Sequence, residues 1–597
     1  MVGTIIVSPA RAEQPLYVAY PPANHQTTAQ QIFLIGSAPA TGEVLVNGKA
    51  IARSSSGNFA PSFPLQLGEN LFTLRYQNQE LKIKVTRQST APVLPVGLAF
   101  AKDSLTPAVD IAKMPGELIC FGAIAPPKAT VSVKLGNQTI PLMARNQDVQ
   151  LPPNSAILTQ QEQPISQPLI GQYQGCTTAE TPANLGNPQF QLTMNGQTTT
   201  QQGVGKVSIL SPATLEVAEV ISKEGVARTG PSTDYSRLTP LPKGTRATIT
   251  GREGGWVRLD YGAWLKASEV QIIEGTVPPV SLIRSVRARK VEGATEIIFP
   301  LQVPVPVSVQ QGNRTFTLTL YNTTAQTDTI RLDDDPVISR LDWQQLAPGK
   351  LQYTFNLKSL QQWGYSLRYE GTSLILSLRH PPISSRQRES VSSTLIYGSN
   401  IISGEVISSS KTPLAGIKIL LDPGHGGPED LGSVGPTGYP EKAVVLLVSK
   451  LVREQLVAKG ATVYLTREED IDLGLQERVD MIEKLQPNIA ISLHYNALPD
   501  QGDAINTKGI GTFWYNTQSH SLAMFLHNYL VQELNRPSYG VFWNNLALTR
   551  PHTTPAVLLE LGFMINPVEF EWITNPQEQQ KLAVTLADGI TQWFMTR

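Results

Sequence analysis

The chain has 597 residues, of which 41% are hydrophobic and 16% charged, and its formal net charge at pH 7 is +0. A chain of this length exceeds what one hydrophobic core organises, so we expect several domains. The balanced charge gives no indication of a nucleic-acid partner, and no apolar run approaches the roughly 18 residues of a transmembrane segment.

The first 14 residues end in Ala10-Arg11-Ala12, a small-residue pattern at which secretory signals are cleaved. The apolar part before it is short and lacks a basic start. We therefore interpret residues 1–14 as the remnant of a signal peptide, with an ordinary chain start as the alternative. The protein would then be exported, to the periplasm or cell wall. Export would allow Cys120 and Cys176 to form one disulfide; two unpaired thiols are the alternative, and the sequence leaves both open.

Two β-rich regions come first. Residues 15–87 alternate apolar and polar side chains and carry Asn47-Gly48, a strong hairpin signal. They resemble bacterial immunoglobulin-like domains. Residues 88–210 predict a second, irregular β domain, within which residues 146–187 are rich in Gln, Pro, Ser and Thr and predict a long loop or insertion.

Residues 215–273 contain four short motifs in order: Gly225-Val226-Ala227-Arg228-Thr229-Gly230-Pro231-Ser232, Leu241-Pro242-Lys243-Gly244-Thr245, Gly255-Trp256-Val257-Arg258-Leu259 and Gly262-Ala263-Trp264-Leu265. This order resembles bacterial SH3-like domains, with Ala263 standing where that pattern has glycine. The resemblance implies binding of cell-wall peptides. The alternative is a structural spacer in which Trp256 and Trp264 are core residues.

Residues 281–380 return to β patterning and resemble the AMIN domain, a targeting module attached to bacterial wall amidases. The resemblance rests on Ile283-Arg284-Ser285-Val286-Arg287 and on the alternation from Tyr369 to Leu378. Residues 274–280, with a Pro-Pro pair, and residues 381–413, rich in Ser, Arg and Pro, predict linkers.

From residue 414 onward, strand and helix patterns alternate, which predicts an α/β domain with a mostly parallel sheet. Apolar runs end at Leu421, Leu493 and Leu559, and helical spacing follows Glu441 and residues 475, 521 and 577. We therefore expect a multidomain protein, in which several all-β domains precede a C-terminal α/β domain spanning residues 414–597.

His425, His494 and Glu560 each follow an apolar strand closely. Ligands of open α/β sheets bind at the carboxyl edge of the strands, so these residues should converge there. Glu441 opens a helix on the same side. Each residue alone has an ordinary structural explanation, such as a loop hydrogen bond or a salt bridge. Together, two imidazoles and a carboxylate suit a zinc ion with an open position, and a further carboxylate can act as general base.

Residues 414–597 resemble the zinc-dependent N-acetylmuramoyl-L-alanine amidases of bacterial cell walls. The resemblance rests on ordered motifs: Asp422-Pro423-Gly424-His425-Gly426-Gly427, Glu441-Lys442, Leu465-Thr466-Arg467, Ser492-Leu493-His494-Tyr495-Asn496-Ala497, and Pro555 to Phe563 followed by Asn566. It implies His425, Glu441 and His494 as zinc ligands and Glu560 as the catalytic glutamate. Tyr495 departs from the usual small residue. His552 is expected in an exposed loop, with a position that flanks the substrate groove as the alternative.

The implied function is hydrolysis of the amide bond between N-acetylmuramic acid and L-alanine of peptidoglycan. Zn²⁺ is the expected cofactor, peptidoglycan the expected partner, and a protein activator a further candidate. The segment 498–508 is too short for the helix that plugs the site in some relatives, so self-blocking of that kind is not expected. Two alternatives stay open: a zinc peptidase that cuts within the stem peptide, and a non-catalytic cell-wall-binding protein.

Overall fold

The computed structural model describes residues 15–90, 93–145, 147–158, 163–273, 277–382 and 412–597. The interpreted signal remnant (residues 1–14) and almost all of the 381–413 linker lie outside the described residues. The described chain divides into two compact units, and each is treated by itself below. One comprises the residues up to 90, residues 361–365 and those from 379 on; the other comprises residues 91–360 and 366–378.

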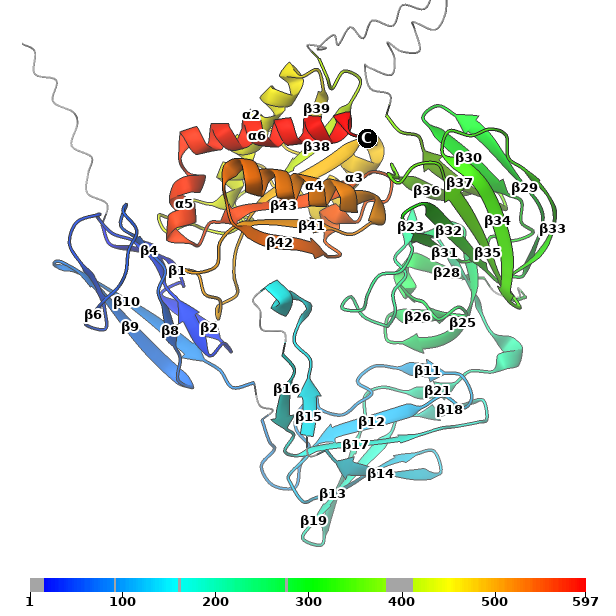
Figure 1. Cartoon of the computed structure of the whole chain (residues 1–597). Helices are drawn as coiled ribbons and strands as arrows, with labels where there is room; N and C mark the ends of the chain where they lie inside the picture. Colours follow the sequence, from blue (N-terminus) through cyan, green and yellow to red (C-terminus); the bar gives the residue numbers. More distant parts are fainter. Residues whose placement is uncertain (1–14, 91–92, 146, 159–162, 274–276, 383–411) are drawn as a thin grey trace, which may run out of the picture. The chain divides into compact units, whose positions relative to one another are not determined.

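The first unit begins with a β domain, residues 15–87, which we call the N-terminal β domain (Figure 1). Its largest sheet has the order β2-β10-β9-β5-β6, and shorter sheets pair β1-β4-β7 and β3-β8. Asn47 and Gly48 form the two-residue turn between β5 and β6, both with positive φ, as the hairpin signal indicates. The strands are β1 (Tyr17–Tyr20), β2 (Asn24–Thr27), β3 (Gln31–Phe33), β4 (Ile35–Ser37), β5 (Val44–Val46), β6 (Lys49–Ala50), β7 (Asn58–Phe59), β8 (Ser62–Pro64), β9 (Gly68–Tyr76) and β10 (Gln79–Arg87).

The same unit contains an α/β domain with one six-stranded sheet, in the order β39-β38-β40-β43-β41-β42. All neighbours pair parallel except β41 and β43, so the sheet is mostly parallel, as predicted. The elements are β38 (Lys418–Pro423), α2 (Glu441–Ala458), β39 (Thr462–Leu465), α3 (Leu475–Leu485), β40 (Ile489–Asn496), β41 (Ile510–Trp514), α4 (Thr517–Leu534), β42 (Ser538–Trp543), η4 (Ala547–Thr549), β43 (Ala556–Phe563), α5 (Pro567–Ile573) and α6 (Pro576–Met595).

Side-chain alternation divides the strands of this sheet between two layers. One face, including Leu421 and Leu493, packs with apolar residues of α2, α4 and α6 in the main core. The other face, including Leu420 and Ala490, packs on α3 and η4 in a smaller cluster. Asp422 and Ser492 are one residue further along β38 and β40 than Leu421 and Ile491, so they belong to the α3 face, near the carboxyl edge of the sheet.

The second unit is built of β strands. Its larger sheets have the orders β12-β17-β14-β13-β19-β20, β18-β21-β11-β25-β22-β28, β33-β29-β30-β37-β36 and β31-β32-β35-β34; β26 pairs with β25, and β27 pairs with β26. Its first strands are β11 (Ile111–Lys113), β12 (Ile119–Ile124), β13 (Thr130–Leu135), β14 (Gln138–Ala144), β15 (Gln147–Gln150), β16 (Ile165–Pro168), β17 (Gln172–Thr177), β18 (Ala183–Gly186), β19 (Gln189–Met194), β20 (Gln197–Gln202) and β21 (Val207–Ile209).

The remaining strands are β22 (Val217–Val220), β23 (Glu224–Gly225), β24 (Leu241–Pro242), β25 (Arg246–Glu253), β26 (Trp256–Leu259), β27 (Trp264–Lys266), β28 (Val270–Ile273), β29 (Ser281–Val291), β30 (Ala294–Phe299), β31 (Val307–Gln311), β32 (Thr315–Tyr321), β33 (Thr323–Arg331), β34 (Ile338–Ala347), β35 (Lys350–Leu357), β36 (Tyr365–Glu370) and β37 (Ser373–Arg379). Of the two tryptophans of residues 215–273, Trp264 is buried and Trp256 is half-buried.

One prediction for this unit is wrong. The stretch 146–187, expected as a long loop or insertion, contains strands β15 to β18. Of these, β17 pairs with both β12 and β14 and buries Tyr173. Cys120 lies opposite Cys176 in this pairing, and the two form the disulfide that the sequence left open. Because its composition is polar, β17 was not predicted as a strand, although its pairing with β12 and β14 and the Cys120–Cys176 disulfide hold it in place.

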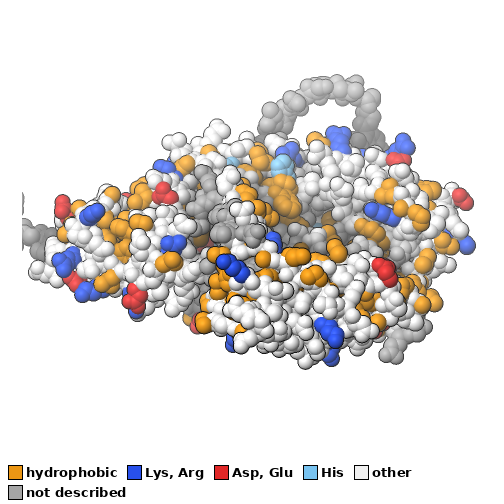
Figure 2. Space-filling model, turned by 90° about the horizontal axis from the view of Figure 1, so that it is seen from below, with side chains coloured by type: hydrophobic (Ala, Val, Ile, Leu, Met, Phe, Trp, Pro, Cys, Tyr) orange, Lys and Arg blue, Asp and Glu red, His pale blue; other side chains and the backbone are white. Residues whose placement is uncertain are grey.

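Among the described helices, none is long and apolar enough to cross a membrane. On the face drawn in Figure 2, basic and acidic side chains are scattered singly between neutral ones. A continuous patch of one sign, as expected for a nucleic-acid-binding surface, does not occur on that face among the coloured residues.

We expect reduction of the disulfide to destabilise the second unit. The bond closes a sequence separation of 56 residues, and restricting the unfolded chain to that extent contributes about 4 kcal/mol. Unfolding of the full chain by urea, followed with and without reductant, should lose a comparable free energy. The double substitution Cys120→Ser/Cys176→Ser should reproduce the loss and abolish the effect of reductant. Equal stability in all samples would contradict the assignment.

Candidate metal centre

The loop after β38 brings His425 to the carboxyl edge of the sheet. His425 has φ +57°, in the left-handed region that a side chain with a Cβ rarely adopts. Gly424 precedes it, and a Cβ there would come within 2.2 Å of the His494 ring. Glycine at position 424 is therefore required for the two imidazoles to approach each other.

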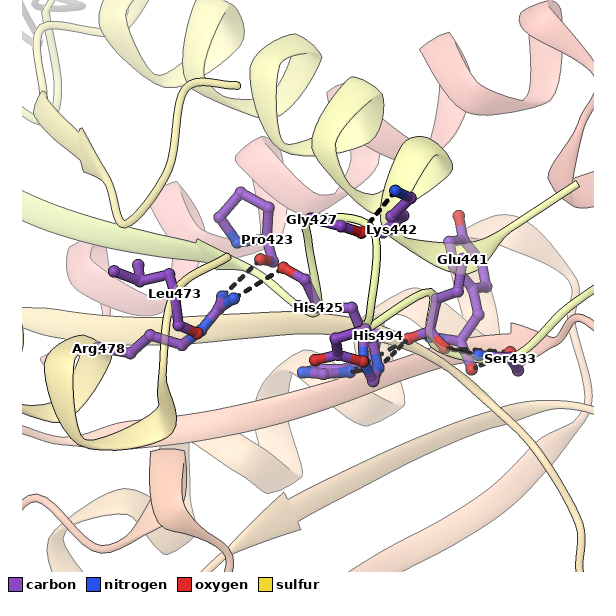
Figure 3. A network of polar contacts seen from close by, with 12 residues as sticks. Pro423, His425, Gly427, Ser433, Glu441, Lys442, Leu473, Arg478 and His494 are labelled. Atoms are coloured by element: carbon purple, nitrogen blue, oxygen red, sulfur yellow. Dashed lines mark hydrogen bonds and ion pairs between the residues drawn. The ribbon is translucent and has the colours of Figure 1, made fainter. Parts of the chain in front are cut away.

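Glu441 and His494 reach the same point from other elements. Glu441 is the first residue of α2, as predicted, and is only 2% exposed. His494 lies in β40, next to β38 and β43 in the sheet. The three side chains point toward one another in Figure 3. The structure thus brings together three of the four residues singled out from the sequence, from one strand, one loop and one helix start.

Three atoms of these side chains form a compact triangle. His425 Nε2 lies 3.2 Å from Glu441 Oε1 and 3.2 Å from His494 Nδ1, and the latter two atoms are 3.1 Å apart. Four ligands around a tetrahedral ion with bonds of about 2.0–2.1 Å stand about 3.3 Å apart. Among the described residues, this is the group of His, Cys, Asp and Glu whose arrangement could hold a metal ion.

Neighbouring residues orient two members of the triangle, His425 and Glu441. Asp430 Oδ1 lies 2.6 Å from His425 Nδ1, which leaves Nε2 facing the other two residues. Glu441 Oε2 accepts hydrogen bonds from the backbone N–H and hydroxyl of Ser433, at 2.8 and 3.0 Å. The backbone N–H of Tyr495 donates to Glu441 Oε1 at 2.9 Å. These contacts fix which atoms are presented to a ligand.

The electrostatics of the triangle favour a cation at its centre. Burial disfavours a charged imidazole, but the carboxylates of Glu441 and Asp430 outweigh burial and raise the pKa of His425 to about 9. Burial would likewise raise the pKa of Glu441, yet both imidazoles hold that pKa far below its usual value. A carboxylate that stays ionised here attracts positive charge, whether protons on the imidazoles or a metal ion that replaces them.

Glu560 stands beside the triangle without belonging to it. Its register partners are His494 on β40 and Gly511 on β41. Its Oε2 atom is buried and has no hydrogen-bond partner in the described structure. Burial raises the pKa of Glu560 to about 7; the two imidazoles act in the opposite direction and the Glu441 charge in the same one. A carboxylate with a free oxygen and a pKa near neutrality suits proton transfer.

Two buried arginines, Arg467 and Arg478, bind the loop that carries His425. Arg467 belongs to one of the sequence motifs, whereas Arg478 belongs to none of them. Arg478 of α3 donates to Asp422 Oδ1 and to the carbonyls of Pro423 and His425, each at 2.7 Å (Figure 3). Arg467 donates to the carbonyls of Pro423 and Gly424 at 3.1 and 2.9 Å. The signal for Arg478 was its spacing: it lies four residues before the buried Ile482, on the apolar face of the predicted helix.

Asp422 is the anion that keeps Arg478 in place. It is 1% exposed and also accepts from the hydroxyls of Thr466 and Ser492, at 2.5 and 2.6 Å. Burial alone would raise the pKa of Asp422, but the Arg478 charge and the two hydroxyls outweigh it and lower that pKa. The pair therefore stays ionised inside the domain.

Three further features noted in the sequence can be placed in the structure. Tyr495 is 1% exposed and belongs to the main core, so it contributes packing and not a ligand. His552 was expected in an exposed loop, but it is buried and its ring packs 4.8 Å from that of Tyr365. Residues 497–509, which follow β40, contain turns and no helix, in agreement with the expected lack of a plugging helix.

Comparisons with known proteins point to one family. Residues 419–592 match the family model described as N-acetylmuramoyl-L-alanine amidase, and residues 226–271 match that of the bacterial SH3 domain. The chain is 34% identical over 199 residues to the germination-specific N-acetylmuramoyl-L-alanine amidase of Bacillus subtilis, which covers 30% of this chain and 81% of that protein.

Two further relatives match the same part of the chain. The probable cell wall amidase LytH of Staphylococcus epidermidis is 32% identical over 188 residues, covering 31% of this chain and 62% of that protein. Among solved structures, the catalytic domain of CwlV, an N-acetylmuramoyl-L-alanine amidase from Bacillus (Paenibacillus) polymyxa var. colistinus, is 30% identical. It covers 30% of this chain and 99% of that structure, with a TM-score of 0.28.

We expect Arg478→Met to destabilise the α/β domain by about 3–5 kcal/mol, because Asp422 would remain buried without its charge partner. Urea unfolding of the full chain measures this loss. The matched control is Arg453→Met, since Arg453 pairs with Glu468, whose side chain is 58% exposed. Exposed pairs contribute about 0–1 kcal/mol. Losses of equal size in both variants would refute a special role for Arg478.

Proposed function

The chain belongs to the family of N-acetylmuramoyl-L-alanine amidases, and from this premise we propose that residues 414–597 cleave peptidoglycan with one zinc ion. The bond is the amide between N-acetylmuramic acid and L-alanine of the stem peptide. His425, Glu441 and His494 hold the ion, and Glu560 acts as the catalytic glutamate. The observation that carries the proposal is the triangle of three ligand atoms within 3.2 Å of one another, beside a carboxylate whose buried Oε2 atom has no hydrogen-bond partner.

The donor set supports zinc as the metal. Two imidazole nitrogens and one carboxylate oxygen are ligands that catalytic zinc sites use, and such sites leave the fourth position open. When bound, zinc would polarise the scissile carbonyl and acidify a water molecule. A zinc ion is stabilised by a negatively charged ligand, which Glu441 provides. It also needs imidazoles held in one orientation, and Asp430 orients the His425 ring.

The chain's own residues supply the remaining chemistry. Glu560 accepts a proton from the attacking water through its unpartnered oxygen and returns it to the departing amine of L-alanine. The residue is half-buried, its Oε2 atom is shielded from solvent, and it lies level with His494 in the strand register. The products are a glycan strand without its peptide and a free stem peptide that starts at L-alanine.

Both alternative functions are weaker than the amidase. A zinc peptidase acting within the stem peptide would use the same ligands, but the matched relatives named above are amidases. A non-catalytic wall-binding protein would not need Glu560 with a free oxygen beside three converging ligands. Analysis of reaction products separates all three.

We also propose the domain boundaries outside the catalytic domain, the cellular location and a protein activator. We retain the division into domains at 15–87, 88–210, 215–273, 281–380 and 414–597, including the AMIN-like assignment of residues 281–380. Action in the periplasm or cell wall is supported by the Cys120–Cys176 disulfide, because such bonds persist in oxidising compartments. A protein activator stays a candidate partner.

Digestion of purified peptidoglycan by the full chain tests the central proposal. We expect mass spectrometry to find free stem peptides that begin with L-alanine, and we expect a zinc chelator to abolish them. Glu560→Gln should lower kcat by about 10²–10⁴ while zinc content stays at one per chain. Fragments cut inside the peptide would establish the peptidase instead. A folded, zinc-loaded chain with full activity in Glu560→Gln would remove Glu560 from the mechanism.

Asp430 should affect how tightly the ion is held. Asp430→Ala leaves the His425 ring without its partner at Nδ1, so we expect zinc affinity to fall about 10–100-fold. Competition with a fluorescent chelator measures the affinity. Glu429→Ala, at the neighbouring exposed position, is the matched control and should retain wild-type affinity. Indistinguishable affinities in the two variants would contradict the orienting role.

A further inference from the structure

The N-terminal β domain has a run of four apolar residues, of which only two belong to its own core. Ile32 and Leu34 pack inside that domain. Phe33 and Ile35 alternate with them and so point to the opposite side of the strands. They are nevertheless only 2% and 1% exposed. Something outside the domain's own core therefore covers them.

The covering side chains come from the α/β domain. Phe33, Ile35 and Ala60 form one buried cluster with Ala504, Phe563 and Ile565, and each of the six is at most 4% exposed. Phe563 ends β43, the strand that carries Glu560. Ala504 lies in residues 497–509, which we call the 497–509 loop and which directly follows β40, the strand of His494.

The N-terminal β domain also makes polar contacts with the 497–509 loop. The hydroxyl of Tyr20 donates to Asp500 Oδ1, and His25 Nε2 lies 3.0 Å from Asp500 Oδ2. The side-chain amide of Gln31 donates to the carbonyl of Gln501 at 2.6 Å. Three side chains of the N-terminal β domain thus contact two consecutive residues of the loop that follows the strand of His494.

A second polar contact lies on α5. Glu571 accepts from the hydroxyl of Ser55 and the backbone N–H of Ser56, both at 3.1 Å, and from the Asn58 amide at 3.4 Å. Burial would raise the pKa of Glu571, but hydrogen bonds from Ser54, Ser56 and Ser55 lower that pKa. An apolar cluster flanked by two sets of polar contacts is the arrangement of a specific protein interface.

We propose that the N-terminal β domain is a working part of the catalytic unit: it clamps the 497–509 loop and the end of β43 against the sheet edge that carries His494 and Glu560. Its role is thus not only to deliver the enzyme to the wall. A catalytic domain without it would expose Phe563, the last residue of the strand that carries Glu560, and Ile565, which follows that strand. The functional unit is therefore larger than the segment 419–592 that matches the family model.

Two substitutions in the full chain test the clamp. Phe33→Asp places a charge in the shared cluster but leaves the domain's own core of Ile32 and Leu34 intact. Glu571→Lys reverses the charge that accepts from the Ser55–Asn58 turn. The controls are Leu71→Asp, at a 57% exposed position of β9, and Glu533→Lys, at an exposed position of α4.

Hydrogen–deuterium exchange of the zinc-loaded chain reads the loop directly and does not depend on which bond the enzyme cuts. We expect amides of the 497–509 loop to exchange about tenfold faster or more in both interface variants, and at the wild-type rate in both controls. Exchange in the β9–β10 hairpin should stay slow in Phe33→Asp, which establishes that the N-terminal β domain remains folded. Unchanged loop exchange in both Glu571→Lys and Phe33→Asp would overturn the proposal.

Turnover of a small soluble fragment, muramic acid carrying its stem peptide, separates a clamp from a delivery domain. A domain that only delivers the enzyme to insoluble wall contributes nothing with this substrate. We expect both interface variants to lose about tenfold in kcat with zinc content unchanged. Both interface variants could show faster loop exchange and still turn over the fragment at the wild-type rate. That result would overturn the clamp, because the domain would then act only in delivery.

Discussion

The metal centre depends on one buried ion pair, that of Asp422 and Arg478. The loop after β38 must turn sharply and hold His425 at a positive φ, a conformation that costs about 1–2 kcal/mol for a residue with a Cβ. Charge-assisted hydrogen bonds contribute about 1.5–3 kcal/mol each, and Arg478 makes two of them to carbonyls of this loop. The arginine can be buried there only because Asp422 compensates its charge. The ion pair thereby links β38, the loop that follows it and the position of His425.

The sheet edge then supplies the rest of the chemistry by strand register. Because β40 pairs in parallel with β43, His494 and Glu560 come to the same level, one facing the ligand triangle and the other keeping a free carboxylate oxygen beside it. The continuation of both strands is covered by Phe33 and Ile35 of a domain more than 400 residues away in sequence (Ile35 to Ala504 spans 469 positions). The centre is thus fixed from inside by arginines and from outside by a β domain.

The sequence could predict the site because its residues follow strands that are apolar on both faces, and such strands are visible as uninterrupted runs. It could not predict β42, whose residues Ser538–Trp543 include Gly540 at φ +140° and lie at the sheet edge with little burial. The seven-residue helix α5 was also too short for a periodic signal. The packing between the two domains could not be predicted for another reason. Phe33 and Ile35 interrupt the apolar–polar alternation of a half-buried strand, but a local sequence pattern does not identify the residues that bury them.

Diffraction from crystals of the zinc-loaded chain, collected at the zinc absorption edge, tests the central claim most directly. We predict one anomalous peak per chain, at about 2.0–2.2 Å from His425 Nε2, His494 Nδ1 and a carboxylate oxygen of Glu441, with Glu560 outside bonding distance. A peak at another place, no peak from zinc-loaded protein, or a peak ligated by Glu560 would contradict the account.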